Sequence, residues 1–148
     1  MTPISHIILI CDAKRGLIMH SQAVNGTNTL KIDREFHNEL AASSHLSGSS
    51  PPGRTSNKSG PTSAVESPDY HEQDKMRFIR MLSKEFMAYA KTHADAAIIM
   101  VAPPRSLALL RQATEVDFKT RTTMEIDKDI TKNTMDDIKL FINKIIKK

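Results

Sequence analysis

The residues best placed to do chemistry in this sequence are polar and basic side chains that recur along one predicted helix. They follow one another at steps of 4, 3, 4 and 7 residues: Gln73, Arg77, Arg80, Lys84 and Lys91. At about 100° per residue, these steps keep all five side chains within a narrow wedge of the helix surface. A one-sided basic ridge can follow a phosphate backbone, so the spacing predicts binding of RNA or another anion.

The segment just before this helix adds two more cations to the predicted interface. Arg54 and Lys58 lie in a Ser-, Gly- and Pro-rich stretch, residues 43–68, whose composition predicts a long flexible loop. The competing interpretation is that Lys and Arg only solvate the outer face of an amphipathic helix. No aromatic residues interleave with the cations, so base stacking is unsupported at this stage.

Carboxylates near strand ends form a second candidate group, because metal-dependent hydrolysis needs several of them at one edge of a sheet. The candidates are Asp12, Glu72, Glu85, Asp127 and Asp129. Asp12 ends the first predicted strand, which is the right place for such a site. The fourth strand, however, ends in Ala102-Pro103 and supplies no carboxylate. This incomplete set favours a turn-forming role for Asp12, and we predict no metal site.

A third candidate is the strand-to-helix junction at residues 103–106. Arg105 and the free N–H groups of the helix start could hold an anion there. Pro104 removes one donor and no Gly-rich loop is present. The competing interpretation is therefore that these residues only end the strand and begin the helix.

The histidines form no cluster with metal-ligand spacing: His6, His20, His37, His45, His71 and His93. No nucleophile elbow, Cys/His pair or phosphate-binding loop occurs, so we expect no cofactor.

The strands that must position these residues are indicated by short apolar runs. Residues 96–102 predict a strand buried on both faces, which must stop where two prolines follow. Residues 6–12, 17–22 and 29–37 predict three strands joined by tight turns, the second turn at Asn25-Gly26. Arg34 breaks the alternation of the third strand, which predicts an edge position or a bulge there. Residues 122–126 predict a last short strand.

Three helices complete the predicted fold. The long helix covers about residues 70–92, and its core face consists of Phe78, Ile79, Leu82, Phe86, Tyr89 and Ala90. A second helix covers residues 107–113 with Pro104 or Ser106 in its first turn. A last helix begins near Thr134 or Asp137. The order β-β-β-α-β-α-β-α predicts one three-layer α/β domain over residues 1–148, with a mixed sheet of about five strands. This is the element order of the ribonuclease H-like class, in which the first strand is central.

Composition narrows the class of protein further. The chain has 148 residues, a net charge of +4 and a single cysteine, so it cannot form an internal disulfide. We expect Cys11, at the end of an apolar run, to be a buried and inert thiol. No run is long enough to span a membrane, and no basic segment precedes the first apolar run, so we expect a cytoplasmic protein. An exposed sheet edge would leave homo-oligomerisation open.

Several strings of residues occur in an order that resembles a known family. These are residues 7–18 with Cys11-Asp12-Ala13, Pro52-Gly53-Arg54, Arg77-Phe78, Val101-Ala102-Pro103-Pro104-Arg105 and Glu125-Ile126-Asp127-Lys128-Asp129. Together they resemble the bacterial host attachment protein family, the proteins required for attachment to host cells. The resemblance implies a domain related to the middle domain of archaeal and eukaryotic class-1 release factors. That domain hydrolyses peptidyl-tRNA through a Gly-Gly-Gln loop before its long helix, and part of the family is proposed to act on ribosomes or RNA.

The resemblance carries over only in part to the candidate catalytic residue. Gln73 precedes Phe78 by five residues, as the release-factor glutamine precedes its Arg-Phe pair, but His71 and Glu72 stand where Gly-Gly is expected. We therefore expect a non-catalytic binding module that contacts RNA, the ribosome or another anionic partner. The alternatives are a peptidyl-tRNA hydrolase using Gln73, a ribonuclease H-like metal-dependent nuclease using Asp12, and a homo-oligomeric interaction protein.

Overall fold

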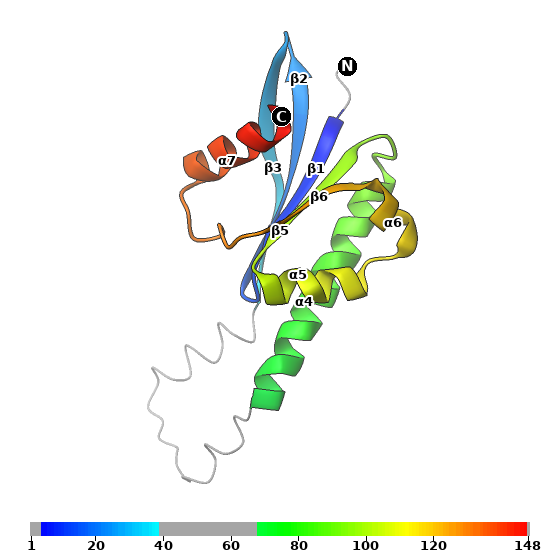
Figure 1. The fold of residues 1–148 in the computed structure, drawn as a ribbon, viewed down its shortest axis with the longest axis vertical. Helices are drawn as coiled ribbons and strands as arrows, with labels where there is room; N and C mark the ends of the chain where they lie inside the picture. Colours follow the sequence, from blue (N-terminus) through cyan, green and yellow to red (C-terminus); the bar gives the residue numbers. More distant parts are fainter. Residues whose placement is uncertain (1–3, 39–67, 148) are drawn as a thin grey trace.

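A five-stranded mixed sheet forms the centre of the molecule in the computed structural model, which describes residues 4–38 and 68–147 (Figure 1). The strands are β1 (Ile4–Cys11), β2 (Arg15–Val24), β3 (Thr27–His37), β5 (Ala97–Ala102) and β6 (Thr122–Asp127). Their order in the sheet is β3-β2-β1-β5-β6. β1 is central, antiparallel to β2 and parallel to β5, and β6 is parallel to β5. The predicted mixed sheet of about five strands is confirmed.

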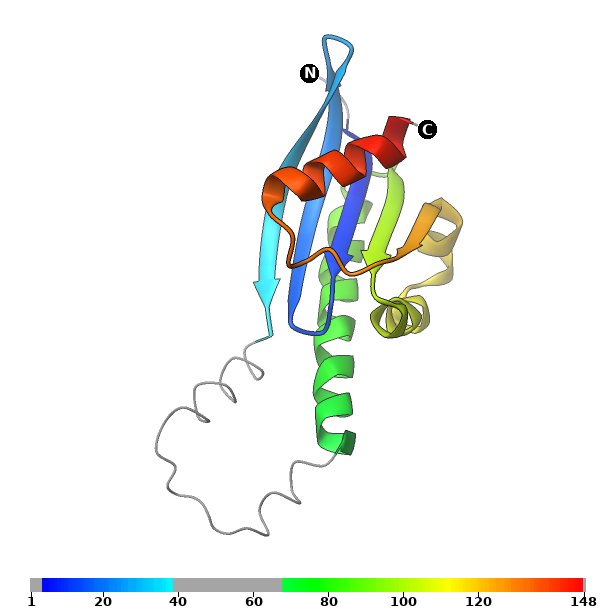
Figure 2. The same cartoon turned by 60° about the vertical axis from the view of Figure 1, so that its left-hand side comes forward.

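Helices cover both faces of this sheet (Figure 2). They are α4 (Pro68–Lys91), α5 (Pro104–Ala113), α6 (Val116–Arg121) and α7 (Met135–Lys147). Residues of α4, α5 and α6 pack in one buried cluster, while α7 packs in a second cluster on the opposite face. The predicted loop at residues 43–68 lies outside the described residues, except for Pro68, which begins α4. None of the helices in the described part of the chain has the length and apolar character that a membrane span requires.

β1 contributes to both clusters because its side chains alternate between the two faces. Ile7 and Leu9 pack toward α4, and Ile8 and Ile10 pack toward α7. A strand covered on both sides reads as a continuous apolar run, since neither face meets water. Burying each of these side chains contributes roughly 1.5–3 kcal/mol, so the central strand is a main source of stability.

The three antiparallel strands follow their sequence signals closely. Asn25 and Gly26 both take positive φ, at 52° and 78°, as a two-residue hairpin turn demands. β3 lies at the edge of the sheet. Its pairing with β2 shifts between Arg34 and Ile32, which leaves Asp33 as the extra residue of a bulge. The expected irregularity therefore exists, one residue before the position predicted for it.

α4 is the longest helix, and its first turns extend past the end of the sheet (Figures 1 and 2). Its buried face contains Phe78, Ile79, Leu82, Phe86 and Ala90, as the spacing predicts. Tyr89, predicted for the same face, is half-buried and packs against this cluster, and its hydroxyl donates a hydrogen bond to Asp33.

The helices in the second half of the chain agree only in part with the prediction. α5 begins at Pro104, one of the two residues predicted for its first turn, with Pro103 at the N-cap in an extended conformation. α6 was not predicted at all. It has six residues and buries one side chain, Phe118, so no helical periodicity marks it in the sequence. α7 begins as predicted, where the Thr134 hydroxyl oxygen accepts the Asp137 backbone N–H at 3.2 Å.

Candidate functional site

The predicted cations gather on the outer face of α4. All five predicted residues are exposed, and we call this set the α4 ridge: Gln73, Arg77, Arg80, Lys84 and Lys91. They lie opposite the side chains that α4 buries against the sheet. From Arg77 to Lys91 the ridge extends for about 21 Å at 1.5 Å per residue. Arg54 and Lys58, also predicted to bind anions, lie outside the described residues.

The arginines of the ridge differ from the other arginines in the part of the chain that the structure describes. Five of those seven arginines donate hydrogen bonds to carboxylates or carbonyls: Arg15, Arg34, Arg105, Arg111 and Arg121. Arg77 and Arg80 have no acceptor among the described residues. A guanidinium with no acceptor among the described residues has donors that could meet a ligand, and its planar fork suits phosphate.

Two acidic residues of α4, Glu72 and Glu85, lie beside the ridge and are already engaged. Glu85 Oε1 accepts a hydrogen bond from Arg34 Nη1 of β3 at 2.6 Å, and Glu72 Oε2 accepts one from Arg105 Nε at 2.6 Å. Arg105, predicted as an anion ligand, is therefore paired with the flank of α4 and does not extend the ridge. These exposed pairs contribute little to stability. In each pair the arginine offsets the negative charge of the carboxylate, so these acids do not cancel the positive charge of the ridge.

Gln73, the candidate hydrolytic residue, lies on the ridge itself, one turn before Arg77. Its exposed side chain fits a surface contact with a ligand. Asp12, the candidate for metal-dependent hydrolysis, instead stabilises the turn between β1 and β2. Its Oδ1 accepts the backbone N–H groups of Lys14 and Arg15, both at 2.8 Å, and its Oδ2 lies 2.8 Å from the Thr131 hydroxyl. This is the Asx-turn role that the sequence favours.

Asp129 also lies beside Thr131, with its Oδ1 2.9 Å from the same hydroxyl. Within residues 4–38 and 68–147, however, no three His, Cys, Asp or Glu side chains converge on a site that could hold a metal ion. Two carboxylates sharing one threonine do not provide the donor set that two-metal hydrolysis requires.

A cavity of about 630 Å³ opens between the end of β3 and α4. The described residues that line it are Glu35, Phe36, His37, Asn38, Asp74, Arg77, Phe78 and Met81. Arg77 belongs to both this cavity and the ridge, so the two features are continuous. Sequence reasoning missed the cavity because its walls come from segments about 40 residues apart, and no local spacing records their approach.

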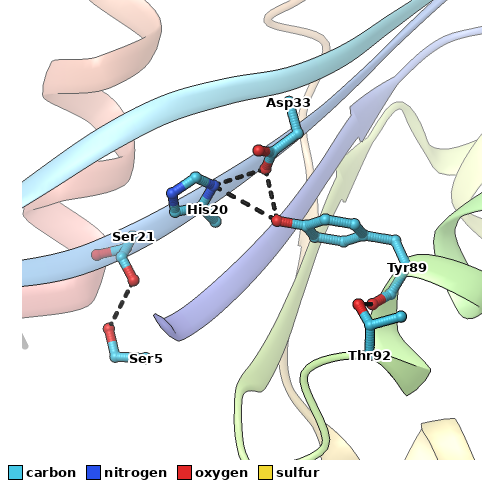
Figure 3. Close-up of polar contacts among 6 residues, drawn as sticks. All are labelled: Ser5, His20, Ser21, Asp33, Tyr89 and Thr92. Carbon is cyan, nitrogen blue, oxygen red and sulfur yellow. Dashed lines mark hydrogen bonds and ion pairs between the residues drawn. The ribbon is translucent and has the colours of Figure 1, made fainter. Parts of the chain in front are cut away.

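A polar cluster fastens the other half of α4 to the sheet (Figure 3). The Tyr89 hydroxyl donates to Asp33 Oδ2 at 2.7 Å, and His20 Nδ1 lies 2.6 Å from the same oxygen. Burial, and then the hydrogen bond to Asp33, raise the pKa of Tyr89. The phenol therefore stays protonated at neutral pH and acts as a hydrogen-bond donor. The cluster joins β2, the β3 bulge and α4, and it holds the ridge in place.

A comparison with known protein families finds a match over most of the described domain. Residues 7–140 match the model of a family described as "Protein required for attachment to host cells". No curated protein matches the chain. The matched range includes most of β1, the other four strands of the sheet and all of α4, so it covers both the ridge and the cavity.

Proposed function

The chain belongs to the family of proteins required for attachment to host cells, and on this premise we propose that it is a non-catalytic module whose α4 ridge binds RNA. The RNA would be met as a free strand or within the ribosome. Such a partner would place the protein in the cytoplasm, as the sequence predicts.

The observation that carries this proposal is the contrast among the arginines. Arg77 and Arg80 lie one turn apart, exposed and without an acceptor among the described residues, while the other five described arginines are paired. Lys84 and Lys91 continue the same line. Cations that only solvated the helix would be expected to pair with acids three or four residues away, as helix surfaces commonly do. Here Glu72 and Glu85 of α4 pair with Arg105 and Arg34 of other elements, and no described acid pairs with Arg77 or Arg80. This favours an external anion as the partner of the ridge.

The arrangement of the elements supports two finer assignments that we also propose. The strand order β3-β2-β1-β5-β6, with β1 central, supports a ribonuclease H-like assignment. A long helix carrying Gln73 shortly before Arg77-Phe78 supports a relationship to the middle domain of class-1 release factors. The lack of Gly-Gly before Gln73 and the engaged oxygens of Asp12 favour binding over catalysis.

The proposal is tested by reversing two charges on the ridge. Arg77→Glu with Arg80→Glu should weaken binding of a labelled single-stranded RNA of about 12 nucleotides by at least about tenfold, because two phosphate contacts become repulsive. Fluorescence anisotropy measures the affinity. The matched control is Lys139→Glu with Lys144→Glu on α7, which makes the same charge change on the opposite face of the sheet.

The control should lose less than about threefold, because charges beyond a Debye length of about 8 Å are largely screened. Equal losses in both double variants, or none in the ridge variant, would contradict the proposal. The non-catalytic part is tested separately with peptidyl-tRNA. Hydrolysis above background by the wild-type protein that disappears in Gln73→Ala would refute it.

A further inference from the structure

The cavity beside the ridge has the size of a small-molecule site. Its volume is about 630 Å³, within the range of roughly 300–1,000 Å³ that such sites occupy. One wall comes from the end of β3 and the other from α4. Arg77 lines the cavity and also stands on the ridge. A phosphate held by Arg77 would therefore bring the attached nucleoside to the cavity mouth.

Among the described lining residues, Asp74 has a side-chain oxygen without a hydrogen-bond partner. Asp74 Oδ2 accepts the Asn38 amide N–H at 3.1 Å, but Asp74 Oδ1 is buried and receives no hydrogen bond from any described residue. Glu35, the other acid among the described lining residues, is already contacted by Arg15 at 3.2 Å and His37 at 3.4 Å. A buried acceptor left unpaired is costly, and a ligand N–H group would satisfy it.

The rest of the wall is suited to a flat ring. Phe36, Phe78 and Met81 supply aromatic and thioether surface. Such surfaces bind bases by stacking and dispersion. No aromatic residue lies among the ridge cations along the sequence, so the sequence alone gives no support for base stacking. The fold brings the aromatic ring of Phe36 in β3 to the cavity beside α4.

A carboxylate selects among the bases by its need for donors. Guanine presents N1–H and N2–H₂ side by side on its Watson–Crick edge, so it can satisfy an Asp carboxylate through two hydrogen bonds. Adenine, cytosine and uracil each place an acceptor next to their donor, which would oppose the carboxylate. We propose that this cavity binds an unpaired guanine of the RNA strand on the α4 ridge, with Asp74 reading its Watson–Crick edge. This inference rests on the proposed function.

The experiment compares oligouridine RNAs of about 12 nucleotides that differ at one central base. Wild-type protein should bind the central guanine at least about tenfold more tightly than central adenine, with inosine between them because it lacks the 2-amino group. Asp74→Asn should reduce the guanine-to-adenine ratio to about one. Asp136→Asn on α7 removes the same charge on the opposite face of the sheet and should keep the full ratio. Circular dichroism confirms that both variants fold, and the inosine comparison needs no variant.

Free guanosine monophosphate separates a strand-borne guanine from a soluble nucleotide. It should bind at least about 100-fold more weakly than the guanine RNA, since it lacks the ridge contacts. Equal affinity for the monophosphate and the RNA would contradict the proposal that the bound guanine belongs to an RNA strand. Equal affinity for the guanine and adenine RNAs, with salt-dependent binding intact, would overturn the cavity proposal alone. Failure to bind any of the RNAs would overturn both proposals.

Discussion

Gly16 is a position where β2 passes too close to α4 to leave room for a methyl group. A Cβ on Gly16 would lie 2.6 Å from Leu82 Cδ2 and 2.8 Å from Leu82 Cδ1. Carbon atoms in favourable contact are about 3.5–4.0 Å apart. Leu82 lies on the buried face of α4 and is fully buried against the sheet, so its side chain cannot move into solvent. Gly16→Ala therefore strains Leu82 or pushes α4 away from the sheet.

Two opposing terms set the size of this effect. Overpacking a core costs about 1–3 kcal/mol. Alanine in a strand interior gains about 0.5–1 kcal/mol over glycine, because it loses less backbone entropy on folding. Overpacking wins, and we expect Gly16→Ala to lower the free energy of unfolding by about 1–2 kcal/mol. For a chain of this size, the thermal midpoint should fall by about 2–8 °C.

Urea unfolding followed by far-ultraviolet circular dichroism suits this chain, which has no tryptophan. Leu82→Ala tests the cause, because it removes the atoms that the new methyl group would meet. That substitution alone should cost about 2–5 kcal/mol. In its background, Gly16→Ala should become neutral or stabilising, a coupling of about 1–3 kcal/mol. Equal destabilisation in both backgrounds, or a more stable Gly16→Ala single variant, would refute the steric argument.

Two further predictions concern buried polar and thiol groups. Tyr89→Phe should lower the free energy of unfolding by about 1–2 kcal/mol through loss of its hydrogen bond to Asp33, as measured by urea unfolding; an unchanged midpoint would contradict the fastening role. Burial, then the charges of Asp12 and Asp129, raise the pKa of Cys11, so an aromatic disulfide reagent at about pH 8 should label it only at the rate of unfolding. Rapid labelling of the folded protein would contradict this.

Most of the fold could be predicted because its signals are local. The apolar run of β1, the Asn25-Gly26 turn and the helical spacing of α4 each lie within one stretch of chain. The α4 ridge was predictable for the same reason, since residues three, four or seven apart share a helix face. A six-residue helix such as α6 has no such period, and it went unpredicted.

The parts that could not be predicted depend on contacts between distant segments. The His20–Asp33–Tyr89 cluster joins three elements, and no spacing along the chain predicts it. The pairing of Arg105 with Glu72 could not be foreseen either, because it depends on how α5 packs beside α4. The cavity is of the same kind, since Phe36 and Asp74 meet only when β3 and α4 are in place.

The salt dependence of RNA affinity tests the central proposal most directly. If Arg77, Arg80, Lys84 and Lys91 each meet one phosphate, the logarithm of affinity should fall with the logarithm of salt concentration with a slope of about −2.8 for a single strand and about −3.6 for a duplex. Arg77→Glu with Arg80→Glu should make the single-strand slope shallower by about 1.4 or more. A salt-independent affinity, or a slope that is the same in the wild type and this variant, would contradict an RNA-binding ridge on α4.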